Sequence, residues 1–485
     1  MATEITTLNP QPVWENFYRL TQIPRPTGQM EAVTRFVYDF GKSLGLETEK
    51  DETGNVLIRK PASKGFENRK TVTLQSHLDM VPQKNSNVAH DFAKDPIDAY
   101  IDGDWVRARG TTLGADNGIG VAFAMAILGD NSLKHGALEA LFTINEEVGM
   151  DGAFGLKPGF IRGDILLNCD SEDEGKLFAG CAGGTDVNVS FRYKKGEPLI
   201  EGDIAVRLFV SGLKGGHSGC DIHLGRANAN KLLFRFLKEA VSDYGVRLAS
   251  VDGGSLRNAI PREAEAVLTL PKDNVELLWE SVSDFQDIYR KEYAGIEDNI
   301  TFTAELTKPP LSLIPEEIQD DLINSVEACQ NGVATMFHDF PGTVESSSNL
   351  AIVKSSESAI EVKILARSSS ASRMDALLSS LESVFALAGA KVEFSGSYNG
   401  WQPDIQSPIL NLMKQVFQKM YGRDPDISVI HAGLECGIIQ GAYPDMDMVS
   451  VGPDVKFPHS PDEAVSISSV QRTYEFLIAV LEDIT

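Results

Sequence analysis

Apolar residues recur at helical spacing near the start of the chain. Over 28–44 they fall every three or four positions, which predicts an amphipathic helix; the residues on its apolar face are Val33, Phe36, Val37, Phe40 and Leu44. An earlier helix is predicted over 11–22. A turn at Thr53-Gly54-Asn55 then separates two short strands, 47–51 and 55–59.

Largely apolar strands alternate with helices over 71–170 and again near the end of the chain. The predicted strands cover 71–76, 138–145, 165–169 and 446–451, and the helices cover 114–128, 409–420 and 466–482. Strands that are apolar on both faces are typical of a parallel sheet with helices on both sides. These segments predict an α/β domain with a mainly parallel sheet, made of 1–186 and 398–485.

The pattern changes over 187–397. Here the strands alternate polar and apolar residues and lie between amphipathic helices, which predicts half-buried strands of an α+β sandwich. The segment is long for one four-stranded ferredoxin-like unit. We interpret it as an inserted lid domain in which that unit is doubled. The alternation of strands and helices repeats from 299–306 onwards.

Acidic and imidazole side chains stand mostly at the ends of the predicted α/β strands. One pair follows the first strand, another pair ends the second, and others follow later strands or open the apolar helix. They are His77, Asp79, Asp116, Glu146, Glu147, Asp170 and His459. Because the carboxyl ends of parallel strands share one edge of the sheet, where ligands bind, we expect these groups to converge there.

Five of these residues could hold metal ions. His77, His459, Asp116, Glu147 and Asp170 offer nitrogen and oxygen ligands without a thiolate, which suits catalytic Zn²⁺, or Mn²⁺ and Co²⁺, better than a structural zinc site. Two ions need a shared ligand, and a short Asp is suited to bridge them. Three carboxylates and one hydroxide balance two dications, and a neutral cluster is cheaper to bury than a bare charge.

The remaining acids of the set suggest supporting and catalytic roles. Asp79 lies two residues from His77 along an extended backbone, so it can reach the far ring nitrogen and fix the imidazole tautomer. Glu146 and Glu147 are neighbours at a strand end where the chain can turn. One carboxylate could then bind metal while the other takes a proton from a bridging water.

The inserted region contributes three further candidates. His217, with glycines on both sides over 215–219, could donate to a developing oxyanion, or it is a surface residue of a glycine-rich turn. Arg367 could grip a substrate carboxylate, or it is a surface residue at a strand end. Asn258 is a third lid candidate, although a turn residue explains it as well. The turn 431–435 could line the site or only reverse the chain.

The composition of the chain is typical of a globular protein and disfavours several kinds of binding partner. The chain has 485 residues, enough for two or three folding units, with 42% hydrophobic and 23% charged residues as in globular proteins. Its formal net charge of −25 disfavours binding to nucleic acid and anionic lipid. The five cysteines show no paired spacing, and neither a secretory leader nor a membrane-length apolar run is visible. We therefore expect a cytoplasmic protein that binds neither nucleic acid nor membrane.

The combined motifs resemble those of the aminoacylase and dipeptidase family of co-catalytic zinc metallopeptidases. They span most of the chain and are specific in combination: Ser76-His77-Leu78-Asp79, Gly114-Ala115-Asp116-Asn117-Gly118, Asn145-Glu146-Glu147-Val148-Gly149, Asn168-Cys169-Asp170, Gly215-Gly216-His217-Ser218-Gly219 and Pro458-His459-Ser460. Within the family, the phrases around 111–116 and 181–184 resemble its carnosinase-like branch, which cleaves aminoacyl-histidine dipeptides.

The resemblance implies a dinuclear zinc centre with defined ligands. His77 and Asp170 would hold one zinc ion, Glu147 and His459 would hold the other, and Asp116 would bridge the two. Co²⁺ or Mn²⁺ are possible substitutes.

The resemblance also implies roles around that centre. Glu146 would be the general base and acid, and Asp79 would orient His77. His217 would be the oxyanion donor of the lid. Arg367 would match the family's position that binds the substrate carboxylate.

The expected function is therefore metal-dependent hydrolysis of short peptides, with aminoacyl-histidine dipeptides among the substrates. An N-acyl-amino-acid deacylase or a carboxypeptidase with the same machinery is one alternative, and a catalytically dead metal-binding scaffold is another. A serine hydrolase is disfavoured because no Gly-x-Ser-x-Gly elbow is present. Many relatives pair through the lid, so a homodimer is an expected state, whereas a doubled lid that completes the site within one chain weakens that expectation.

Overall fold

The computed structural model describes residues 2–485, and its chain forms two compact units. Unit 1 comprises 2–181, 401–429 and 434–485, and unit 2 comprises 182–400 and 430–433. The sequence predicted the insertion as 187–397. Unit 2 begins earlier because strand β9 (Gly183–Arg192) already pairs with strand β18 (Ala359–Ser368) at Gly183, opposite Ser368.

Unit 1 is built on a mixed sheet of eight strands. Its strands, in spatial order, are β1 (Glu47–Lys50), β2 (Val56–Lys60), β6 (Leu138–Thr143), β3 (Val72–His77), β7 (Ile165–Asn168), β21 (Asp447–Ser450), β8 (Lys176–Cys181) and β20 (Asp426–Ile430). The central strands β6, β3, β7 and β21 run parallel, whereas β1, β2 and β8 pair antiparallel with their neighbours. The predicted parallel sheet is thus confirmed for its central strands, and antiparallel strands extend both sides.

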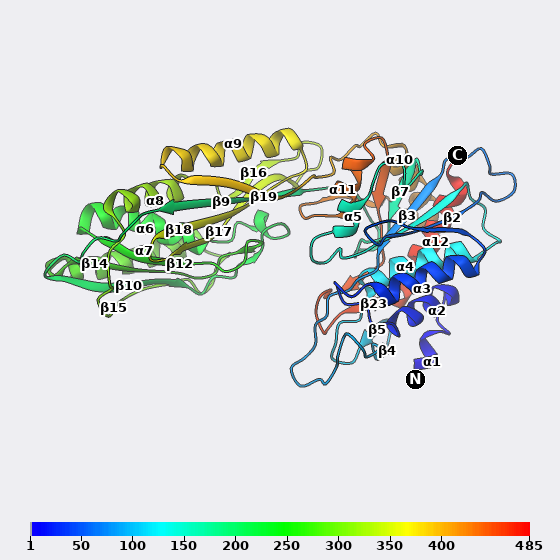
Figure 1. Cartoon of the computed structure of the whole chain (residues 1–485), viewed down its shortest axis with the longest axis horizontal. Coiled ribbons are helices and arrows are strands. Elements are labelled where there is room, and N and C mark those ends of the chain that lie inside the picture. Colours follow the sequence, from blue (N-terminus) through cyan, green and yellow to red (C-terminus); the bar gives the residue numbers. More distant parts are fainter. Residues whose placement is uncertain (1) are drawn as a thin grey trace. The chain divides into compact units, whose positions relative to one another are not determined.

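Helices pack against this sheet and against one another (Figure 1). They are α1 (Ala2–Ile5), α2 (Gln11–Thr21), α3 (Glu31–Ser43), α4 (Ala115–Gly129), α5 (Asp151–Gly155), α10 (Pro408–Tyr421), α11 (Glu435–Ala442) and α12 (Ile467–Asp483). Helix α2 packs on α4 and α10 packs on α12, while α11 contacts α5 and β8. A small second sheet contains β22 (Val455–Lys456), β23 (Ala464–Ser466), β5 (Trp105–Ala108) and β4 (Ala99–Asp102).

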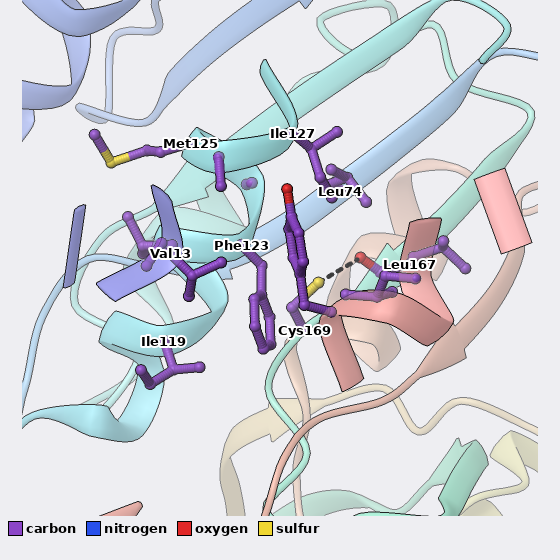
Figure 2. Packing of buried hydrophobic residues seen from close by; sticks show 14 of the residues in the cluster. Val13, Leu74, Ile119, Phe123, Met125, Ile127, Leu167 and Cys169 are labelled. Atoms are coloured by element: carbon purple, nitrogen blue, oxygen red, sulfur yellow. Dashed lines mark hydrogen bonds between the residues drawn. The ribbon is translucent and has the colours of Figure 1, made fainter. Parts of the chain in front are cut away.

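Helix α4 is the centre of the unit 1 core. It is apolar on every side and buried from Asn117 to Leu128, so it needs neighbours all round. Figure 2 shows Ile119, Phe123 and Ile127 of this helix among buried residues that include Leu74 of β3 and Leu167 of β7. Burying one such side chain contributes about 2 kcal/mol. This packing holds the first turn of α4 near the ends of β3 and β7.

Unit 2 contains one continuous sheet of nine strands, and neighbouring strands pair antiparallel throughout the described residues. Its order is β15 (Thr301–Leu306), β10 (Asp203–Ser211), β14 (Ala264–Pro271), β12 (Arg247–Gly253), β17 (Val344–Ser355), β18, β9 and β19 (Lys391–Tyr398), and β16 (Gly332–Met336) pairs with β17. Helices α6 (Ala229–Tyr244), α7 (Val275–Glu292), α8 (Glu316–Ala328) and α9 (Ala371–Leu387) share one core with the sheet (Figure 1). Shorter elements are β11 (Gly216–His217), β13 (Ala259–Ile260) and the 3-10 helices Ile222–Leu224 and Lys272–Asn274.

The order of these strands contains the ferredoxin-like pattern twice. Strands β10, β12, β14 and β15 with α6 and α7 form one βαββαβ unit, and β9, β17, β18 and β19 with α8 and α9 form the other. The two join where β12 pairs with β17. The prediction that 299–306 opens the second unit was wrong: β15 closes the first unit, because the first unit is inserted after strand β9 of the second.

None of the helices in the described part of the chain combines the length and the apolar character that a membrane span requires. Four of the five cysteines are buried, and Cys220 is exposed.

Candidate active site and metal centre

The residues predicted from the α/β pattern gather at one edge of the unit 1 sheet. His77 is the last residue of β3, and Asp170 follows the end of β7. Asp116 lies in the first turn of α4, and His459 lies in the connection between β22 and β23. The candidate metal ligands therefore come from five segments that are far apart in the sequence, counting the one that holds Glu146 and Glu147.

Asp116 lies between the two imidazoles. Its Oδ1 is 3.1 Å from Nε2 of His77, and its Oδ2 is 3.1 Å from Nε2 of His459. Oδ1 of Asp170 lies 3.3 Å from the same nitrogen of His77, and Oε2 of Glu147 lies 2.9 Å from Nε2 of His459. Two groups of potential ligands, His77–Asp116–Asp170 and Asp116–Glu147–His459, thus share Asp116.

A left-handed turn separates the two neighbouring glutamates from their strand. Strand β6 ends at Thr143, two residues before the predicted end, and Asn145 has φ +52°. The asparagine side chain suits this conformation better than most residues do. The turn allows Glu147 to reach His459 while Glu146 and Glu147 both lie in the potential ligand group of His77.

Asp79 organises this turn. Its carboxylate accepts hydrogen bonds from the backbone N–H of Glu146 (3.0 Å) and of Glu147 (3.2 Å), and from the hydroxyl of Thr27 (2.9 Å). Its Oδ1 lies 3.5 Å from Nδ1 of His77, which is an ionic contact longer than a usual hydrogen bond. The predicted contact with His77 is present, and the tighter bonds go to the backbone of the glutamate pair.

Burial and neighbouring charges shift the protonation of the cluster strongly. Burial opposes charge on His77, but Asp170, Asp116 and Asp79 together raise its pKa well above the usual value. Hydrogen bonds that the ring of His459 donates to Asp116 and Glu147 raise its pKa to about 11. Burial raises the pKa of Asp170 to about 6 and that of Glu146 well above its usual value. The carboxylates of the cluster therefore stabilise positive charge on the two imidazoles that they surround.

Three further buried ionic residues lie near this edge, and the sequence patterns assign a specific role to none of them. Arg25 donates to backbone carbonyls, Glu463 accepts from backbone N–H groups, and Glu435 accepts hydrogen bonds from Gln75 (2.6 Å) and Thr143 (2.7 Å). Their exposed fractions are 2%, 2% and 0%. Glu435 belongs to the turn 431–435 that was expected to line the site or only turn. No pattern in the sequence distinguishes these residues from surface charges.

The candidates from the insertion gather in unit 2. The strands β11 and β13 pair so that His217 is opposite Ala259, and the carbonyl of Asn258 accepts a hydrogen bond from the N–H of Ser218 (2.8 Å). The side chain of Asn258 is exposed. The assignment of Asn258 to substrate binding stays a prediction.

His217 has a defined tautomer. Its Nδ1 faces the backbone N–H groups of Gly219 (3.2 Å) and Cys220 (3.1 Å), which can only donate. Nδ1 is therefore unprotonated, and in the neutral ring the proton is on Nε2. Burial and the charge of Arg367 lower the pKa of His217, which favours the neutral ring.

Arg367 is buried, with 5% of its surface exposed. Its guanidinium contacts only neutral side chains, the hydroxyl of Tyr398 at 3.1 Å and that of Ser218 at 3.5 Å. Among the residues that the structure describes, no carboxylate forms an ion pair with it. The alternative of a surface arginine at a strand end is therefore wrong, and the buried positive charge lacks a close counter-ion.

Comparison with known proteins identifies the family of the chain. The profile described as Peptidase family M20/M25/M40 matches residues 73–483. The chain belongs to this peptidase family. The resemblance drawn from the motifs is thereby confirmed, and so is the class of reaction, hydrolysis of peptide bonds.

Individual members of peptidase family M20/M25/M40 match over their full length. The "Cytosol non-specific dipeptidase" of Escherichia coli (strain K12) is 45% identical over 482 residues, 99% of both chains. The crystal structure of "Aminoacylhistidine Dipeptidase from Vibrio alginolyticus" has 46% identity and a TM-score of 0.92, covering 99% of this chain and 98% of that one. Aminopeptidase PepT from Bacillus cereus, at 16% identity and a TM-score of 0.58 over 98% and 99% of the two chains, shares the fold.

Proposed function

We propose that this chain is a cytosolic metal-dependent dipeptidase that hydrolyses short peptides, including aminoacyl-histidine dipeptides such as carnosine. The observation that carries the proposal is the position of Asp116 between Nε2 of His77 and Nε2 of His459, at 3.1 Å from each. The names of the two full-length relatives, a cytosol non-specific dipeptidase and an aminoacylhistidine dipeptidase, support the substrate class and the compartment.

The residues at this edge fit a pair of divalent ions. His77 and Asp170 would hold one ion, Glu147 and His459 the other, and Asp116 would serve both. Oε1 of Glu147 is buried without a hydrogen-bond partner, and among residues 2–485 no Lys or Arg forms an ion pair with these carboxylates. A donor set of imidazoles and carboxylates suits Zn²⁺, with Co²⁺ or Mn²⁺ as substitutes. When bound, such ions polarise a carbonyl oxygen and lower the pKa of water.

Glu146 is the proton carrier of the proposed reaction. Its carboxylate takes the proton from the attacking water and returns it to the amine nitrogen of the leaving group as the C–N bond breaks. Two backbone hydrogen bonds to Asp79 fix the turn that presents it. Glu147 would bind a metal ion while Glu146 transfers the proton. One carboxylate could not perform both tasks at once.

His217 is the proposed oxyanion donor. The backbone N–H groups of Gly219 and Cys220 keep Nδ1 unprotonated, so Nε2–H of the neutral ring is available to donate. A donor fixed in one tautomer before the reaction loses no energy to reorganisation as charge develops.

Arg367 is the proposed binding residue for the free carboxylate of the substrate. Its buried guanidinium has only hydroxyl partners, so a substrate carboxylate would supply the missing counter-charge through charge-assisted hydrogen bonds. Such an interaction favours substrates with a carboxylate close to the scissile bond, which are dipeptides. The homodimer expected from the family stays a prediction.

One assay series tests the proposal. Dipeptides, including histidine-ended ones, are compared with tripeptides and N-acyl amino acids before and after chelation. We expect the highest kcat/KM on dipeptides and loss of activity on chelation. Preference for N-acyl amino acids or longer peptides would assign a deacylase or carboxypeptidase instead, and inactivity on every substrate with metal bound would indicate a scaffold.

A further inference from the structure

Glu463 binds the backbone that leads into Asp116. Its carboxylate accepts four backbone hydrogen bonds, from the N–H groups of Leu113 (2.7 Å), Gly114 (2.9 Å), Ala115 (2.7 Å) and Asp116 (3.2 Å). The side chain is buried and lies four residues after His459, in the same connection between β22 and β23. One carboxylate therefore ties the segment of His459 to the segment of Asp116.

Arg25 binds the same backbone from its carbonyl side. Its guanidinium donates to the carbonyls of Leu78 (2.9 Å) and Asp79 (3.1 Å), which directly follow His77, and to the carbonyl of Gly114. Gly114 thus gives its N–H to Glu463 and its C=O to Arg25. Gly114 has φ +71°, and a Cβ atom there would lie 2.5 Å from Nη2 of Arg25, so the close approach requires glycine.

The two side chains together define where Asp116 points. Asp116 has non-helical backbone angles, φ −79° and ψ 111°, although it lies in the first turn of α4. With the preceding residues held on both sides, its two oxygens reach His77 and His459 at equal distances of 3.1 Å. Neither Arg25 nor Glu463 is among the potential ligand groups, so both act through Asp116, His77 and His459.

Burying these two charges is expensive unless their hydrogen bonds are satisfied. Arg25 forms no ion pair within the described residues, and its charge is balanced through space by Glu463, Asp79 and Asp116. Apolar side chains of similar volume would leave the backbone N–H and C=O groups of this segment without partners. The two charges are therefore placed where they hold the backbone that carries Asp116.

We propose that Arg25 and Glu463 are positioning residues that hold Asp116 between His77 and His459, and so set the metal affinity of the cluster. The inference rests on the proposed function, in which Asp116 serves both ions. Loss of partners that orient metal ligands typically lowers metal affinity 10–100-fold, so we expect a decrease of about that size for Glu463→Gln. The glutamine amide keeps the volume of the side chain. Its NH₂ group is itself a donor, so it cannot accept the hydrogen bonds that the backbone N–H groups give to the carboxylate.

Glu139 provides a matched control within the same sheet. It is a buried glutamate that also accepts backbone hydrogen bonds, from Arg162 (2.8 Å) and Gly163 (3.0 Å). It pairs in register with Thr73, whereas the metal end of the same strand pair is His77 with Thr143. Glu139→Gln should therefore lower the Tm without changing the affinity for zinc.

The test is a calorimetric titration of the metal-free full chain with Zn²⁺, together with the visible spectrum of the Co²⁺ form. Glu463→Gln should bind zinc at least about tenfold more weakly than both wild type and Glu139→Gln and should alter the cobalt spectrum. Arg25→Lys, which keeps the charge but cannot hold the three carbonyls in a planar fork, should do the same and replaces Glu463→Gln if that variant does not fold.

Wild-type zinc affinity and spectrum in a folded Glu463→Gln or Arg25→Lys chain would overturn the inference, as would an equal loss in Glu139→Gln. Failure of the wild-type chain to bind zinc, cobalt or manganese would overturn the proposed function itself, which makes the two failures distinguishable.

Discussion

The two units assemble their candidate residues in opposite electrostatic settings. In unit 1, the carboxylates of Asp116, Glu147 and Asp170 surround two imidazoles, and within residues 2–485 no Lys or Arg forms an ion pair with them. In unit 2, Arg367 is a buried cation whose partners among the described residues are two hydroxyl groups, and burial together with Arg367 lowers the pKa of His217. Unit 1 is thus suited to bind cations, and unit 2 is suited to bind an anion and to donate a hydrogen bond.

This contrast explains why different catalytic roles are proposed for the two units. Histidine has a different protonation state in the two units. Hydrogen bonds to acidic partners raise the pKa of His459 in unit 1, whereas burial and Arg367 lower the pKa of His431 in unit 2 to about 3. The two settings can be separated experimentally, because each change described next alters one unit and leaves the other intact.

Removal of metal should have the largest effect, and it acts on unit 1. A chelator takes away the cations that balance the acidic cluster, so dipeptide hydrolysis should fall to the background rate and return on addition of Zn²⁺, Co²⁺ or Mn²⁺. The measurement is turnover of a dipeptide beside elemental analysis of the same sample. Full activity in a sample shown to be metal-free would exclude the proposed chemistry.

Glu146→Gln should come next, with a decrease in kcat of about 10²–10⁴-fold. The amide cannot accept the proton of the attacking water, while the ligands around Asp116 are unchanged. Steady-state kinetics and metal content are measured together, and the metal content should equal that of wild type. Turnover close to wild type would refute the assignment of the proton carrier.

His217→Ala should lower kcat about 10²-fold through loss of the oxyanion donor. It acts in unit 2, so the affinity of the chain for zinc should not change. His223→Ala, which removes an exposed histidine of the same unit, is the control and should leave the kinetics unaltered. Equal kinetics for both variants would remove His217 from the mechanism.

Arg367→Met should weaken substrate binding about 10–100-fold, the value of hydrogen bonds to a charged group. The effect should appear in KM for dipeptides with a free carboxylate and vanish for C-terminally amidated ones. Arg235→Met, at an exposed arginine paired with Glu292, is the control. If the variant discriminates against the amide as strongly as wild type does, Arg367 does not bind the carboxylate.

The smallest expected effect concerns the pH dependence of stability in unit 2. Burial, with Arg367, lowers the pKa of His431 to about 3, and Ser347 contacts its Nε2 at 2.7 Å. Because the folded pKa is below the unfolded value of about 6.5, its stabilising contribution is present above pH 6.5 and is lost as the pH falls towards 3.

The Tm of wild type should therefore fall more steeply than that of His431→Gln between pH 7 and pH 4.5, as measured by thermal denaturation. Parallel Tm curves would show that His431 titrates alike in the folded and unfolded chain.

The sequence predicted the convergence in unit 1 because strand ends can be read from apolar runs. His77 and Asp170 stand directly after such runs, and the edge rule for parallel strands brings them together. Arg25 and Glu463 could not be found in this way. Glu463 follows Pro461 and Asp462 and resembles an exposed turn residue, since its burial depends on Leu113 to Asp116, about 350 positions earlier.

Topology limited the prediction in unit 2. Individual strands such as 204–211 and 264–270 could be predicted from their alternation, and their half-buried character is confirmed. The strand β9 was not recognised as the first strand of the second ferredoxin-like unit, because its partners β18 and β19 lie more than 160 positions later. Local pattern contains no information on such pairings, and so β15 was assigned to the wrong unit.

The central claim is that Asp116 joins two metal ions at the edge of the unit 1 sheet. Elemental analysis of the purified full chain and of Asp116→Ala, after dialysis against limiting zinc, tests it most directly. We expect two ions per wild-type chain and fewer than one in the variant. Retention of both ions by Asp116→Ala, or fewer than two in wild type at saturating zinc, would contradict it.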